Sequence, residues 1–146
     1  MRFDRKTLTW ERAPVSVKPG SFLLVHLWAV ECPPCIKEMP MLRGLLEQLS
    51  DQKRLRILFI SETASRPDLE RHLIANESTL PQVPQYQSTT AELRRALSVN
   101  QQPITLLLDS DLTVRQTFVG SLVGRREELL SAIDRLLAVR QSERRR

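Results

Sequence analysis

The sequence of 146 residues is poor in cysteine, with only Cys32 and Cys35, and this scarcity excludes a domain held together by several disulfide bonds. A bond between these two residues would close a loop too small to stabilise a domain of this size. A zinc site would need two further ligands, and neither His26 nor His72 stands at a zinc-finger spacing from the pair. The two cysteines are therefore expected either to react or to bind a metal ion.

Long apolar runs are also missing from the sequence. The longest, at residues 22–30, is interrupted by His26 and is shorter than the roughly 18 residues that a membrane-spanning helix needs. The N-terminal residues 1–14 carry charges throughout and lack the apolar core of a secretory signal. We therefore expect no transmembrane segment in this chain.

Aromatic residues are few, at four Phe, two Trp and one Tyr, and the net charge of +5 is confined to the chain ends. Residues 2–6 sum to +2, residues 140–146 sum to +3, and residues 7–139 are neutral overall. A nucleic-acid-binding protein usually concentrates basic residues on one face, with aromatic or base-reading groups among them. We therefore expect no nucleic-acid partner, and we interpret residues 140–146 as a solvated basic tail.

The apolar residues follow an alternation of strands and helices. The nearly continuous apolar run at residues 22–30 predicts a strand buried on both faces, and the three- and four-residue spacing from Pro33 to about Leu49 predicts a helix. The other predicted elements are strands at residues 56–61, 104–109 and 113–119, an extended piece near residues 82–86, and helices at residues 68–75, at residues 90–97 and from about residue 124. This order predicts an α/β fold with a central mixed β-sheet flanked by helices.

The two cysteines form the motif Cys32-Pro33-Pro34-Cys35, at the point where the first buried strand gives way to a helix. The N-terminus of a helix has unpaired N–H groups and a partial positive charge, which stabilise a thiolate. Cys32, at the start of the helix, is therefore expected to be the nucleophile. Cys35, one turn further on, is placed to attack the mixed disulfide and release the product.

The segment LVHLWAVECPPCIKEMP at residues 24–40 resembles the active-site segment of the thioredoxin superfamily, and its CPPC core followed by KEMP resembles the TlpA/ResA/DsbE-like branch. The segment VNQQPITLLLD at residues 99–109 resembles the cis-proline loop and the strand that follows it, and Gly120 matches a glycine after the next strand. The resemblance implies a thioredoxin-like fold with a TlpA-type helical insertion at residues 63–98. We assign residues 20–139 to this domain, and residues 1–19 to an N-terminal extension or edge hairpin with a strand within residues 8–17.

Members of this branch are bacterial disulfide reductases, so the resemblance implies that Cys32 and Cys35 reduce protein disulfides and are themselves reduced by an upstream electron donor. It also implies that the peptide bond before Pro103 is cis. Proline is the only residue before which a cis peptide bond is not costly. Gln102 would then offer its backbone to an extended substrate strand. Together with this pair, the expected substrate-binding residues are Trp28, Glu31, Pro33 and Pro34.

The sequence departs from the family at two positions close to the cysteines. Glu31 stands where an uncharged residue is usual, and its carboxylate should raise the pKa of Cys32. Because a less stable thiolate favours the oxidised form of the protein, the protein is expected to act as a reductant. His26 stands on the side of the strand that carries Trp28, where many thioredoxins have an aspartate that moves protons for the second cysteine. An imidazole can do the same for Cys35, or it can simply be a core residue bonded to a backbone carbonyl. Lys37 and Glu38 are expected to be solvated.

An alternative from another class of protein is a module that uses both thiolates to bind or deliver copper, with Met39 or His26 nearby. For the oxidoreductase we expect no cofactor, no bound metal and a monomer. The branch generally works in the bacterial cell envelope, which would require an export signal or anchor that has been trimmed from this chain. Without one the protein would be cytoplasmic, where a CxxC pair would also be kept reduced.

Overall fold

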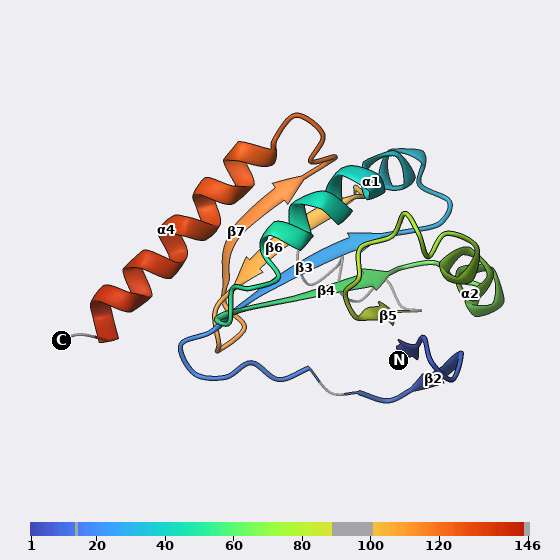
Figure 1. The fold of residues 1–146 in the computed structure, drawn as a ribbon, viewed down its shortest axis with the longest axis horizontal. Helices are drawn as coiled ribbons and strands as arrows, with labels where there is room; N and C mark the ends of the chain where they lie inside the picture. The colour runs from blue at the N-terminus through green and yellow to red at the C-terminus, as the bar shows by residue number, and fades with distance from the viewer. Residues whose placement is uncertain (14, 89–100, 145–146) are drawn as a thin grey trace.

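The computed structural model describes residues 1–13, 15–88 and 101–144, with side chains as far as residue 138 (Figure 1). Its strands form one sheet of seven in the order β2-β1-β5-β4-β3-β6-β7. The strands are β1 (Arg2–Asp4), β2 (Thr9–Glu11), β3 (Phe22–Trp28), β4 (Leu55–Ser61), β5 (Gln85–Gln87), β6 (Ile104–Leu108) and β7 (Val114–Val119). The helices are α1 (Pro33–Gln48), α2 (Arg66–Ala75) and α4 (Arg126–Arg144). The short helix predicted at residues 90–97 lies outside the described residues.

The sheet is mixed, as predicted. β3, β4 and β5 are parallel to one another, whereas β6 pairs antiparallel with β3 and β7 pairs antiparallel with β6. At the other edge the hairpin of β1 and β2 pairs antiparallel with β5. β2 lies within the range predicted for an N-terminal strand, but β1 was not predicted, because three residues are too few to show a periodic pattern.

β3 lies inside the sheet between β4 and β6, and all seven of its residues are buried. Because successive side chains point to opposite faces of a sheet, Leu24 and Trp28 pack on one face while Leu23, Val25 and Leu27 pack on the other. The apolar run that predicted this strand is nearly continuous for that reason.

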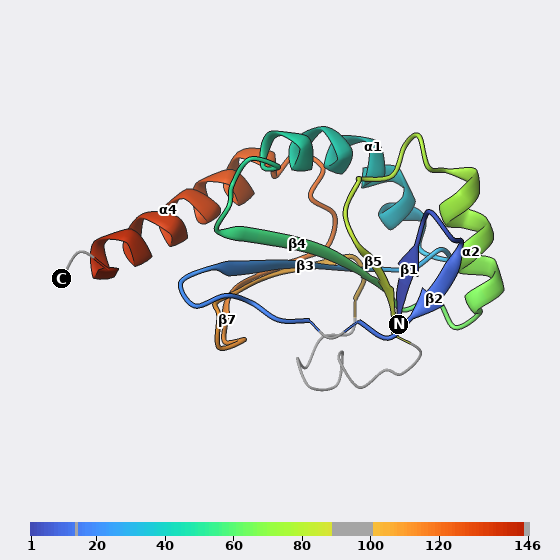
Figure 2. The ribbon, with the colours of Figure 1, turned by 60° about the horizontal axis from the view of Figure 1, so that its bottom comes forward.

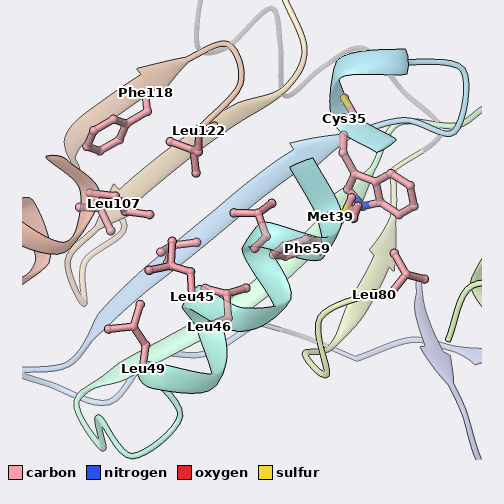
Figure 3. Close-up of a cluster of buried hydrophobic side chains, with 14 of the residues drawn as sticks. Cys35, Met39, Leu45, Leu46, Leu49, Phe59, Leu80, Leu107, Phe118 and Leu122 are labelled. Atoms are coloured by element: carbon pink, nitrogen blue, oxygen red, sulfur yellow. The ribbon is translucent and has the colours of Figure 1, made fainter. Parts of the chain in front are cut away.

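Helices α1 and α4 cover the same face of the sheet, and α2 lies beside the hairpin of β1 and β2 (Figure 2). The larger core cluster lies under α1 and α4, where Leu45 and Leu46 of α1 face Leu107, Phe118 and Leu122 (Figure 3). Among the described residues, none of the helices is both long and apolar enough to cross a membrane.

The topology brings three chain segments together at one end of the strands, which is not the same as an outer strand of the sheet. β3 and β4 are parallel and end there, and β6 begins there because it is antiparallel to β3. Trp28 is paired with Ser61 of β4, and the neighbouring Leu27 is paired with Ile104 of β6. The residues that follow β3, follow β4 and precede β6 therefore lie close together.

Candidate active site

Cys32 is the N-cap residue of α1, as the position of the motif predicted. Its backbone is extended, its N–H donates to the carbonyl of Ala29 at 3.2 Å, and its Sγ accepts from the Cys35 N–H at 3.3 Å. Pro33 and Pro34 occupy the first turn of the helix, where a missing N–H group costs no intrahelical hydrogen bond. The sulfur of Cys32 therefore lies at the positive end of the helix dipole.

Cys32 and Cys35 form a disulfide bond, with Cα atoms 5.2 Å apart. The two sulfurs differ in access, because Cys32 is half-buried and Cys35 is completely buried in the core cluster beneath it. A thiol or disulfide of another molecule can therefore reach Cys32 for thiol–disulfide exchange, but it cannot reach Cys35. This is the asymmetry that an attacking and a resolving cysteine need.

The expected substrate-binding residues after β3 lie at different depths. Glu31, Pro33 and Pro34 are exposed around Cys32. Trp28, in contrast, is fully buried, with its ring centroid 5.7 Å from that of His72 in α2. Trp28 therefore has no surface to offer to a substrate in this structure, and it belongs to the same core cluster as Cys35. Burial lowers the pKa of the neighbouring His72.

The peptide bond between Gln102 and Pro103 is cis, as the resemblance implied. Pro103 is buried at the start of β6, and its carbonyl accepts a hydrogen bond of 2.8 Å from the N–H of Gly120, which has a φ of +89°. Gln102 is half-buried, and its Nε2 donates to Oε1 of Glu62 at 2.6 Å. The side chain of Gln102 is thus held by a residue that sequence reasoning did not select.

His26 is buried with polar partners on both sides of its ring. Its Nδ1 lies 2.8 Å from Oγ1 of Thr105, and its Nε2 lies 2.7 Å from Oε1 of Glu38. All three residues are at most 1 % exposed, so water does not screen these contacts. His26 is therefore a buried residue, but both ring nitrogens lie next to side chains and not next to the backbone carbonyl of the second interpretation.

The expectation that Glu38 is solvated is also wrong, whereas Lys37 is exposed as expected. Glu38 is completely buried, and its second oxygen, Oε2, accepts a hydrogen bond of 2.9 Å from the N–H of Leu122. One signal in the sequence indicates this burial: Glu38 stands three residues after Cys35 and four before Leu42, within the apolar stripe of the helix.

No group of three or more His, Cys, Asp or Glu side chains in the described part of the chain is arranged to hold a metal ion. The two cysteine sulfurs that the copper alternative would use are joined to each other in this structure.

Comparison with known proteins agrees with this geometry. Residues 20–114 match the family model described as thioredoxin-like, and the chain belongs to that family. It is 25 % identical over 124 residues to sporulation thiol-disulfide oxidoreductase A of Bacillus subtilis (strain 168), a match that covers 84 % of this chain and 73 % of that protein. The chain is thus a member of the thioredoxin-like family, and the relative that it matches is a thiol-disulfide oxidoreductase.

Solved structures share the fold. A putative thiol:disulfide interchange protein DsbE from Chlorobium tepidum has a TM-score of 0.69 at 21 % identity, over 82 % of each chain. StoA from Bacillus subtilis has a TM-score of 0.62 at 19 % identity, over 75 % of this chain and 83 % of that one.

Proposed function

We propose that the protein reduces disulfide bonds in other proteins, with Cys32 as the nucleophile and Cys35 as the resolving cysteine. The observation that carries the proposal is the difference in burial between the two sulfurs at the start of α1. A half-buried sulfur at a helix N-terminus suits attack on an external disulfide, and an enclosed sulfur one turn away suits intramolecular resolution.

The proposed reaction has two exchange steps. The Cys32 thiolate attacks one sulfur of the substrate disulfide, which forms a mixed disulfide, and the other substrate sulfur leaves as a thiolate that takes up a proton. Cys35 then loses its proton and attacks Sγ of Cys32, which releases the second substrate thiol and forms the Cys32–Cys35 bond. Two electrons pass from the protein to the substrate, so a dithiol donor must reduce the protein again.

The pair of His26 and Glu38 is proposed to take the proton that Cys35 loses in the second step. Cys35 and Glu38 are three residues apart on α1 and are both buried, so they lie on the same face of the helix. A buried thiol needs a nearby acceptor, because a proton cannot pass directly to solvent. Thr105 would orient the imidazole through Nδ1, which leaves Nε2 to share a proton with Glu38.

The substrate is proposed to lie across the exposed rim formed by Glu31, Pro33 and Pro34, with an extended strand paired to the backbone of Gln102. The reducing direction is supported by Glu31. Its carboxylate precedes Cys32 and opposes the formation of a thiolate there, which favours the oxidised form of the protein. Glu31 is exposed, so solvent weakens the effect.

A redox titration of the protein against glutathione, with the free thiols tagged and weighed by mass spectrometry, tests this proposal. We expect a reversible two-electron transition near or below about −220 mV. Cys35→Ser is the control, since it removes the intramolecular disulfide and leaves Cys32. A potential near about −120 mV would make the protein an oxidant instead. If no Cys32–Cys35 disulfide formed at any potential, the oxidoreductase proposal would fail, and copper binding would be tested next.

A further inference from the structure

The hydrogen bond between Glu62 and Gln102 joins two segments that are not neighbours in the sheet. Glu62 follows the last residue of β4, and Gln102 is separated from the start of β6 by Pro103 alone. β3 lies between β4 and β6 in the sheet. The two side chains meet at 2.6 Å across the end of β3, where the chain turns toward Cys32. The bond therefore connects the cis-proline loop to the opposite side of the active site.

The backbone on the Glu62 side is itself fixed to the turn that leads to Cys32. The N–H of Glu62 donates to the carbonyl of Trp28 at 2.8 Å, and Oγ1 of Thr63 accepts from the N–H of Val30 at 2.9 Å. Thr63 is completely buried, and its carbonyl accepts a further bond of 2.9 Å from Nε2 of Gln87. The Glu62 carboxylate consequently projects from a backbone with little freedom to move.

We infer that Glu62 is a positioning residue, which fixes Gln102 so that the backbone beside Pro103 is held ready for an extended polypeptide substrate. The inference rests on the proposed function and adds to it the residue that positions the substrate-binding backbone. A substrate that pairs with the Gln102 backbone binds more tightly when that backbone is already fixed, because the protein then loses less conformational freedom on binding. A small disulfide that reaches only Cys32 makes no such pairing and gains nothing.

The bond is strong enough for this role. A hydrogen bond to a carboxylate is shorter and stronger than one between neutral groups, and this one is partly shielded from water. Loss of a hydrogen bond to a charged group typically changes an equilibrium constant about tenfold or more. Glu62 touches neither cysteine in the described contacts, so its effect on the sulfur chemistry itself should be small.

The experiment compares two mixed disulfides of Cys32 in a Cys35→Ser protein, in which the mixed disulfide cannot be resolved. One partner is a cysteine-containing peptide of about ten residues without acidic or basic side chains, and the other is glutathione. The measured quantity is the equilibrium ratio of the peptide-bound to the glutathione-bound protein, determined by mass spectrometry. Glu62→Ala is expected to lower this ratio about tenfold.

Three further variants separate the hydrogen bond from other effects. Glu62→Gln keeps an acceptor oxygen and should lower the ratio less than about threefold. Gln102→Ala removes the same bond from the other side and should also lower the ratio, and the double variant should lower it less than the two single effects combined. Glu47→Ala is the matched control, because Glu47 is exposed near the far end of α1, about 18 Å along the helix from Cys35, and should leave the ratio unchanged.

An unchanged ratio in both Glu62→Ala and Gln102→Ala would overturn the inference. So would equal losses in Glu62→Gln and Glu62→Ala, since these would mean that the charge acts rather than the hydrogen bond. The ratio does not depend on the direction of electron flow. An oxidising potential in the titration would therefore reject the reductase proposal and leave the role of Glu62 to be decided by this ratio.

Discussion

At the scale of single residues, Glu38 joins three separate parts of the fold. It extends from α1, contacts His26 of β3, and accepts a hydrogen bond from Leu122 in the segment after β7. Burying a carboxylate is costly unless it is paired and hydrogen-bonded. The contacts of Glu38 with His26 and Leu122 therefore contribute to the stability of the fold.

We predict that Glu38→Ala lowers the free energy of unfolding by about 3 kcal/mol, because it removes the acceptor of the Leu122 N–H and the carboxylate beside Nε2 of His26. Glu38→Gln keeps an acceptor for Leu122 and should cost less than about half as much. Urea denaturation of the oxidised proteins measures both values. Equal losses in the two variants would contradict the assigned hydrogen bonds.

At the scale of elements, the N-terminal hairpin of β1 and β2 is held against α2 by Trp10. The ring of Trp10 lies 5.1 Å from that of Phe3, its Nε1 donates to Glu70 at 3.2 Å, and the Arg66 guanidinium lies over it at 5.3 Å. The contacts of Trp10 with Glu70 and Arg66 join residues about 60 positions apart along the chain. The hairpin is thus a packed extension of the sheet edge.

Trp10→Ala is expected to lower the free energy of unfolding by about 2 kcal/mol through lost burial and the lost hydrogen bond. Trp10→Phe keeps most of the apolar area and should cost less than about 1 kcal/mol. Neither change should move the redox potential, because the contacts of Trp10 are with the hairpin and α2 rather than with the cysteines. A shift in potential with Trp10→Ala would show that the hairpin influences the active site.

At the scale of the whole molecule, the redox state and the stability of the fold are linked. If the reduction potential of the Cys32–Cys35 pair is lower in the folded than in the unfolded protein, the disulfide stabilises the folded state. The stabilisation is about 1.4 kcal/mol for each 30 mV of difference. A reductant should therefore be more stable when it is oxidised. We expect the oxidised protein to unfold at a higher urea concentration than the reduced one. The opposite order, measured at one pH with Cys32→Ser/Cys35→Ser as the control, would indicate an oxidant.

Much of the architecture could be predicted from the sequence, because it depends on local patterns. The apolar run of β3 and the helical spacing of α1 identify their elements directly, since burial on one or both faces sets the period of apolar residues. The place of Cys32 at the start of a helix follows from the same local boundary. Pro103 was assigned by resemblance to the family, and the cis peptide bond confirms that assignment.

Other features depend on the tertiary structure, because they join residues far apart in the chain. Glu38 meets Leu122 across 84 positions, His26 meets Thr105 across 79, and Gln102 meets Glu62 across 40. A glutamate on a helix is solvated unless another element covers it, and no local pattern shows that β3 and the segment after β7 do so here. The sequence alone therefore determined where the reactive cysteines stand, whereas only the packing of distant segments decided which polar groups surround them.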